Sequence, residues 1–219
     1  MTPLTEFVML QCSNEACRFR CPSNLSHGSL EFCPLCGSPI HAIGKLFTNQ
    51  KVRLESPSVN QTKLDVLLDN LRSTLNVGSI FRTADGAGVN KIHLCGTTPT
   101  PEHPKMAKTG LGAEIQIPWQ YHRNGLDLVK NLQSQGVRVI ALEAAPQSVS
   151  LFSARTFPHP VGSSTLLVIG NEISGVDPLI LETADVILSI PMRGVKSSLN
   201  VAVAFGIAVY TIRESQFME

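Results

Sequence analysis

A polar stretch near the C-terminus has the residue types of a ligand-binding loop. Ser197, Ser198 and Asn200 follow a β-type run at 186–190 and precede an apolar, small-residue segment that predicts a helix over 198–212. The first N–H groups of a helix have no intrahelical partner and can bind a ligand or a capping side chain. Both serines are good N-cap candidates, so the stretch alone favours a capped core helix. Two further segments shift the balance towards a ligand site.

These two segments place polar side chains beside expected secondary structure. Arg82 lies well inside a helix expected over 77–86, after a possible cap at Asn76, beside an apolar face that would leave the arginine half buried. A purely apolar strand at 166–169 runs into a Gly-Asn-Glu turn at 170–172. The simpler interpretations are a surface arginine with a buried stem and an ordinary turn with a solvated glutamate.

Five of the six cysteines lie between residues 12 and 36, where two pairs have the spacing of metal ligands. Cys12 and Cys17 form the first pair, and Cys33 and Cys36 form the second within a Cys-Pro-Leu-Cys-Gly turn. Four thiolates can close a tetrahedral structural zinc site, which would stabilise a module too small to fold on its core alone. Free buried cysteines and a redox role for the second pair are weaker alternatives. Three neighbours could each replace a ligand: Cys21, His27 and His41.

The composition is that of a globular protein with a substantial core. Of 219 residues, 43% are hydrophobic and 16% are charged, which suits one domain of ordinary size with a small appendage. The net charge of +1 provides no global basic field, so nucleic-acid binding would need a local patch or a partner subunit. No segment has the length and apolar purity of a membrane span, and the N-terminus lacks the features of a signal peptide. We therefore expect a cytoplasmic protein without a membrane partner.

The chain divides by residue pattern into three regions. Residues 1–45 are punctuated by cysteines, residues 46–62 are polar and predict a linker, and residues 63–219 alternate strand and helix signals. Strands alternating with helices predict a mainly parallel α/β sheet. The expected strands cover 64–68, 91–95, 137–142, 166–169 and 186–190. The expected helices cover 77–86, 124–135, 177–183 and 198–212.

Taken in order, the three polar segments resemble the motifs of the SpoU/TrmH branch of the SPOUT RNA methyltransferases. The resemblance covers about residues 64–213, and the stretch 108–114 also looks similar to family sequence. The cysteine-rich front is an extension that the family core does not require. The motif residues are Asn76 and Arg82, then Gly170, Asn171 and Glu172, then Pro191, Met192, Ser198, Leu199 and Asn200.

The resemblance implies an α/β fold whose C-terminal part forms a deep trefoil knot. It implies S-adenosylmethionine bound in the knot loops and a homodimer with active sites near the subunit interface. The implied reaction is methyl transfer to a ribose 2′-hydroxyl of transfer RNA or ribosomal RNA. A non-catalytic RNA- or ribosome-binding protein on the same scaffold is the alternative. A zinc-ribbon interaction protein with an inert α/β domain is a third, weaker interpretation.

Individual roles also follow from the resemblance. Gly170, Ile190 and Leu199 would hold the cofactor largely through backbone groups, with Asn171 and Met192 as neighbours.

Arg82 is the catalytic arginine that the resemblance implies. A guanidinium stays protonated, so stabilising developing alkoxide charge suits it better than accepting a proton. Asn76, Ser198 and Asn200 would orient Arg82 and the ribose, and Glu172 would tie Arg82 or the loop by a charge-assisted bond.

Cations beside the motifs would contact RNA phosphates, although each alone is more often a solvated charge. They are Arg72, Arg193 and Lys196. The zinc module, with Arg18, Arg20 and Lys45, would either help select the RNA or act as a structural or dimer-packing element.

Overall fold

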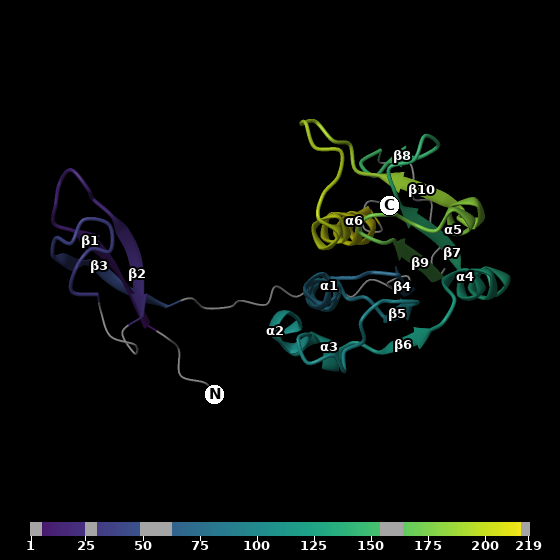
Figure 1. Cartoon of the computed structure of the whole chain (residues 1–219), viewed down its shortest axis with the longest axis horizontal. Coiled ribbons are helices and arrows are strands. Elements are labelled where there is room, and N and C mark those ends of the chain that lie inside the picture. The colour runs from purple at the N-terminus through teal and green to yellow at the C-terminus, as the bar shows by residue number, and fades with distance from the viewer. Residues whose placement is uncertain (1–5, 25–29, 49–62, 154–163, 216–219) are drawn as a thin grey trace. The chain divides into compact units, whose positions relative to one another are not determined.

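The chain separates into two units, Met1–Pro57 and Ser58–Glu219. A computed structural model describes residues 6–24, 30–48, 63–153 and 164–215 (Figure 1). The division falls within the segment expected as a linker, of which 49–62 lies outside the described residues. The start of that segment is a strand, because β3 runs through to Thr48. No helix in the described ranges is long and apolar enough to cross a membrane.

The N-terminal unit contains one antiparallel sheet in the order β2-β1-β3. Its strands are β1 (Glu6–Cys12), β2 (Arg20–Asn24) and β3 (Ile40–Thr48). Val8, Leu10 and Ile40 form a small buried cluster, against which Phe19 and Cys21 pack. Such a core is too small to stabilise a module of this size unaided, so the unit needs a further stabilising element.

The C-terminal unit is built on a seven-stranded sheet in the order β6-β5-β4-β9-β7-β10-β8, and every strand pair is parallel. The expected parallel α/β architecture is therefore confirmed. The strands are β4 (Lys63–Asp69), β5 (Lys91–Cys95), β6 (Trp119–His122), β7 (Arg138–Leu142), β8 (Val149–Ser150), β9 (Ser164–Ile169) and β10 (Val186–Ser189). The helices are α1 (Thr74–Gly86), α2 (Ala107–Gly110), α3 (Ala113–Gln116), α4 (Gly125–Ser134), α5 (Pro178–Thr183) and α6 (Val201–Ser215).

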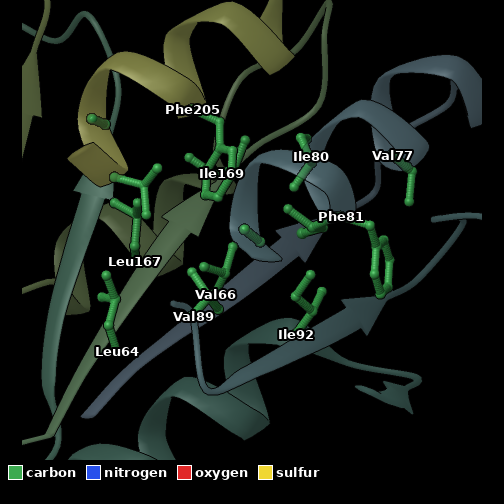
Figure 2. Close-up of a cluster of buried hydrophobic side chains, with 14 of the residues drawn as sticks. Leu64, Val66, Val77, Ile80, Phe81, Val89, Ile92, Leu167, Ile169 and Phe205 are labelled. Atoms are coloured by element: carbon green, nitrogen blue, oxygen red, sulfur yellow. The ribbon is translucent and has the colours of Figure 1, made fainter. Parts of the chain in front are cut away.

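Two apolar layers hold the helices against the sheet. On one face, Phe81 of α1 and Phe205 of α6 are fully buried against strand residues such as Val66 (Figure 2). On the other face, Val129 of α4 and Ile180 of α5 pack in a second buried cluster. Full burial of a Leu, Ile or Phe side chain stabilises a fold by roughly 1.5–3 kcal/mol relative to exposure. The first layer therefore fixes α1 and α6 on one side of the sheet, and the second fixes α4 and α5 on the other.

Two helix starts differ from the expected ones. Helix α1 begins at Thr74, and Ser73 caps it by accepting the N–H of Asn76, so Asn76 is not the cap. Helix α6 begins at Val201, where the Asn200 side chain accepts the N–H groups of Ala202 and Val203 at 2.9 and 3.4 Å. The cap is therefore Asn200, which directly precedes the helix, and not Ser197 or Ser198 as expected. The short elements β6, β8, α2 and α3 were not expected, since four residues or fewer carry too little periodicity.

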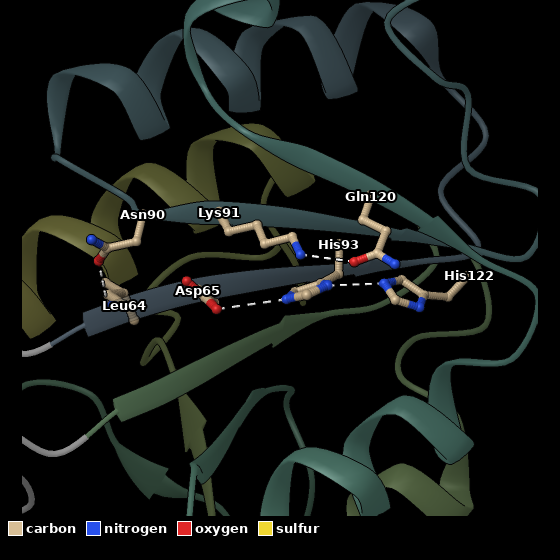
Figure 3. A network of polar contacts seen from close by, with 7 residues as sticks. All are labelled: Leu64, Asp65, Asn90, Lys91, His93, Gln120 and His122. Carbon is tan, nitrogen blue, oxygen red and sulfur yellow. Dashed lines mark hydrogen bonds and ion pairs between the residues drawn. The ribbon is translucent and has the colours of Figure 1, made fainter. Parts of the chain in front are cut away.

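A polar network crosses three neighbouring strands of the sheet. Nδ1 of the buried His93, on β5, lies 3.0 Å from Nε2 of His122, on β6 (Figure 3). Nε2 of His93 lies 3.6 Å from a carboxylate oxygen of Asp65, on β4. Burial, and then the neighbouring His93 and Lys91, lower the pKa of His122. The folded unit therefore disfavours the protonated form of His122.

This pair predicts a loss of stability in mild acid. An unfolded histidine titrates near pH 6.5, whereas His122 in the folded unit resists protonation until lower pH. The unfolded chain thus binds more protons as the pH falls below about 6.5, and the free energy of unfolding decreases. We expect His122→Gln to flatten this decrease between about pH 6.5 and 5. The free energy of unfolding is measured by urea titration at each pH. The fluorescence of Trp119, the single tryptophan, reports on the C-terminal unit that contains His122.

His103→Gln, which removes an exposed imidazole from the same unit, is the matched control. An identical slope in His122→Gln and the unmodified chain would show that the pair does not govern acid stability.

Candidate active site

The carboxyl ends of β7, β9 and β10 meet the start of α6 around a cavity of about 410 Å³. In open parallel sheets this edge is where ligands bind. All five residues expected to hold a cofactor line the cavity: Gly170, Asn171, Ile190, Met192 and Leu199. Four of the five expected catalytic residues also line it: Asn76, Glu172, Ser198 and Asn200. Segments that are more than 100 residues apart in sequence therefore converge on one site.

The loop after β9 is closed on itself. Asn171 and Gly175 exchange two backbone hydrogen bonds of 3.0 Å each, and Asn171 Oδ1 accepts the N–H of Ile173 at 2.9 Å. A Cβ on Gly170 would lie 2.3 Å from the backbone nitrogen of Val176, so only glycine fits there. This tight loop fixes Gly170 and its neighbours at the wall of the cavity.

Glu172 joins the same loop to the beginning of α1. Its carboxylate accepts the backbone N–H of Arg72 at 2.9 Å and of Ser73 at 3.1 Å, and the side-chain amide of Asn76 at 3.0 Å. Burial raises the pKa of Glu172, but these hydrogen bonds outweigh it and the pKa is lowered. The charged carboxylate therefore holds the loop before α1. Of the two expected partners it is the loop, and not Arg82, that Glu172 binds within the described chain.

Asn76 connects this pair to the third motif. The Asn200 side-chain amide donates to Asn76 Oδ1 at 3.1 Å, while Asn200 Oδ1 caps α6. One chain of hydrogen bonds thus runs from Glu172 through Asn76 to Asn200. Within the described chain the two asparagines bind each other at the mouth of the cavity.

Glu143 is a cavity residue that the sequence analysis missed. It follows β7 directly, lines the cavity with Leu142 and Ala144, and accepts the N–H of Val176 at 2.9 Å. The available signal was its position: a carboxylate immediately after a strand, at the edge where neighbouring parallel strands also end. A carboxylate placed there can accept ribose hydroxyl groups of a nucleoside ligand.

Arg82 lies away from this cavity in the single chain. It is exposed rather than half buried, because Val77, Ile80, Phe81 and Ala84 are the α1 residues that face the core. Arg82 lines a second hollow of about 520 Å³ together with residues from α1, α2, the residue after α2, and α6. They are Ser79, Thr83, Lys108, Thr109, Leu111 and Tyr210. Two cations and several hydroxyl groups share this hollow, a composition that suits an anion.

The expected RNA-contacting cations are all exposed. Arg193 and Lys196 lie in the loop between β10 and α6, in which every residue from 191 to 200 is exposed, and Arg72 precedes α1. Met192 and Leu199 in this loop are 37% and 38% exposed at the cavity. Exposed apolar side chains beside a pocket are typical of a binding site.

Four thiols of the N-terminal unit lie together. The Sγ atoms of Cys12, Cys17, Cys33 and Cys36 are all within 4.8 Å of one another, and two pairs are 3.5 and 3.7 Å apart. Zinc–sulfur bonds of about 2.3 Å in a tetrahedron separate sulfurs by about 3.8 Å, so the spacing suits that ion.

The two alternative ligands that the structure describes, Cys21 and His41, are not part of this cluster. Cys21 packs against the small core, and His41 is exposed on β3. His27 lies outside the described residues.

Comparison with known proteins identifies the family. The profile of the SpoU rRNA Methylase family matches residues 63–210. The chain is 30% identical over 199 residues to a 23S rRNA (guanosine(2553)-2′-O)-methyltransferase of Bacillus subtilis, covering 89% of this chain and 77% of the relative. It is 31% identical over 150 residues to the tRNA (guanosine(18)-2′-O)-methyltransferase of Escherichia coli K12, covering 68% of this chain and 62% of the relative.

Solved structures agree with the sequence relatives. An AdoMet-bound rRNA methyltransferase from Sinorhizobium meliloti superposes with a TM-score of 0.63 and 29% identity, covering 82% of this chain and 65% of that one. A TrmH/SpoU tRNA-modifying enzyme from Aquifex aeolicus superposes with a TM-score of 0.61 and 26% identity, covering 72% and 79%. The profile match, the relatives and the shared fold confirm the resemblance seen in the three motifs: the chain belongs to the SpoU methylase family.

Proposed function

We propose that this protein transfers a methyl group from S-adenosylmethionine to a ribose 2′-hydroxyl of RNA. The observation that carries the proposal is the convergence of all three motif segments on one cavity at the carboxyl edge of the sheet. The relatives named above methylate guanosine riboses in transfer RNA or 23S ribosomal RNA, and one structural neighbour holds AdoMet. Either RNA class is compatible with the site.

Gly170, Ile190 and Leu199 would hold the cofactor through backbone groups, with Asn171 and Met192 beside them. When bound, S-adenosylmethionine supplies a methyl group on a positively charged sulfur. The remaining task of the chain is to align the attacking 2′-oxygen with that methyl group. The hydrogen bond between Asn76 and Asn200, and the place of Ser198 in the cavity wall, support this orienting role. Arg72, Arg193 and Lys196 would contact the RNA phosphates.

Arg82 would stabilise the developing negative charge on the 2′-oxygen. Because Arg82 does not line the cavity of its own chain, we propose that a homodimer brings it to the cavity of the partner. The surface around Arg82 supports such contact, since it exposes large side chains: Leu111 is 64% exposed and Tyr210 46%. A cytoplasmic location is part of the same proposal.

The deep trefoil knot also remains a proposal. It is supported by the path of the chain: β10 pairs with β7, and α6 then returns to pack beside α1 through Phe205. The family relatives fold with the same architecture.

The function predicts a specific product. The purified protein, incubated with radiolabelled S-adenosylmethionine and total RNA from a strain lacking its gene, should label a 2′-O-methylnucleoside in one RNA size class. Arg82→Ala should reduce this labelling by about 10²–10³-fold, the usual effect of removing a group that stabilises an oxyanion. Cofactor binding, measured by calorimetry, should be unchanged because the residues proposed to hold the cofactor are not altered.

The exposed Arg123 provides the matched control, as it lies outside both hollows and Arg123→Ala should retain activity. Equal turnover in Arg82→Ala and the unmodified chain would refute the role of Arg82. Cofactor binding without any labelled RNA would favour a non-catalytic RNA-binding protein.

We also propose that Cys12, Cys17, Cys33 and Cys36 bind one structural zinc ion. The sulfur spacing supports it, and so does the small core of the unit, because bound metal then supplies folding energy. Cys33→Ser should abolish zinc binding in elemental analysis and unfold the N-terminal unit. Cys21→Ser, which removes a thiol outside the cluster, should retain one zinc per chain. Equal zinc loss in both variants would contradict this ligand set.

A further inference from the structure

One face of the N-terminal sheet is open. Residues directly opposite each other in antiparallel strands share a face, so the register assigns nine residues to this one. They are Phe7, Met9 and Gln11 of β1, Arg20, Pro22 and Asn24 of β2, and His41, Ile43 and Phe47 of β3. None of the nine is buried. The other face carries Val8, Leu10 and Ile40, the buried core of the unit.

One end of the open face carries an aromatic pair. The rings of Phe7 and Phe47 stack with centroids 5.8 Å apart and planes 25° apart. Phe47 is 42% exposed, because the buried core lies on the opposite face of the sheet. Exposed aromatic rings on a sheet are platforms on which bases of single-stranded nucleic acid stack, at about 1–3 kcal/mol per base.

The other end of the face carries a row of polar groups. Gln11 pairs with Arg20 on one side and with His41 on the other, and both partners are exposed. This row lies four residues along β1 from the aromatic pair, or about 13 Å at about 3.3 Å per residue. The face thus combines a fixed positive charge with stacking rings.

Acidic side chains lie elsewhere in the described part of this unit. Glu6 directly precedes Phe7 on β1 and so belongs to the opposite face, while Glu15 and Glu31 lie outside the three strands. None of the nine residues of the open face carries a negative charge. A face without negative charge is complementary to the uniformly negative phosphate backbone of a nucleic acid. It is less complementary to a protein surface that carries both acidic and basic side chains.

We propose that the open face binds a single-stranded segment of the substrate RNA, with bases on the Phe7–Phe47 pair and phosphates near Arg20 and His41. The proposal rests on the proposed function in taking RNA as the substrate. It assigns the N-terminal unit to RNA selection, separately from the chemistry of the cavity.

The test uses the zinc-loaded full chain and a fluorescein-labelled, twelve-nucleotide oligouridine, with binding followed by fluorescence anisotropy. Phe47→Ala and Arg20→Ala should each weaken binding by about tenfold, the effect of losing one stacked base or one phosphate contact. A duplex of the same length should not respond to Phe47→Ala, because its bases cannot stack on the protein. Zinc content, measured for every variant, confirms that the unit is folded.

Two matched controls come from the same unit. Phe32 is 59% exposed and Arg18 is exposed, and both lie outside the three strands, so Phe32→Ala and Arg18→Ala should bind the oligonucleotide normally. Unchanged affinity in Phe47→Ala and Arg20→Ala, or equal losses in the controls, would overturn the proposal. An altered sedimentation coefficient of Phe47→Ala with unchanged RNA affinity would identify the face as a protein contact and also overturn it.

Failure of the proposed function is distinguishable from failure of this surface. Phe47→Ala should raise the KM for RNA while leaving kcat intact, because the cavity is unaltered. An unmodified chain that methylates nothing, yet binds oligouridine through Phe47 and Arg20, would refute the enzymatic proposal and support the RNA-binding face.

Discussion

The hydrogen-bonded chain Glu172–Asn76–Asn200 is the interaction on which the site depends. It links the loop after β9, the first turn of α1 and the start of α6. Glu172 and Asn76 are 96 residues apart in sequence, and Asn76 and Asn200 are 124 residues apart. Strands alone fix where these segments leave the sheet, but not how their loops meet. By joining them, the chain of contacts gives the cavity one geometry before any ligand arrives, which reduces the ordering that binding would otherwise require.

These hydrogen bonds can form only because apolar packing positions the segments that carry the three residues. Each neutral hydrogen bond contributes about 1 kcal/mol, and water competes at partly exposed positions. Burial of Phe81 and Phe205 fixes α1 and α6 on one face of the sheet, and the absence of a Cβ at Gly170 lets the β9 loop close. The core therefore brings the segments within reach, and the polar chain selects their arrangement.

Sequence reasoning succeeded where patterns are long and failed where single contacts decide. The apolar runs at 91–95 and 166–169 predicted β5 and β9 well, and the three motifs predicted the family and most of the cavity wall. The caps were wrong, because several polar residues precede each helix and only geometry shows that Asn200 reaches the free N–H groups. Glu143 was missed because its role depends on strand order. Arg82 was expected to be half buried but is exposed, because Val77, Ile80, Phe81 and Ala84 occupy the face of α1 that packs on the core.

A double-mutant cycle on Asn76 and Asn200 tests this account most directly. The affinity for S-adenosylmethionine would be measured by calorimetry in the unmodified chain, in Asn76→Ala, in Asn200→Ala and in the double variant. If the polar chain acts as one unit, either substitution breaks it, and the double variant should bind little worse than either single variant, with a coupling energy of about 0.5–3 kcal/mol. Strictly additive losses would show that the two asparagines act independently and would contradict the central role of the chain.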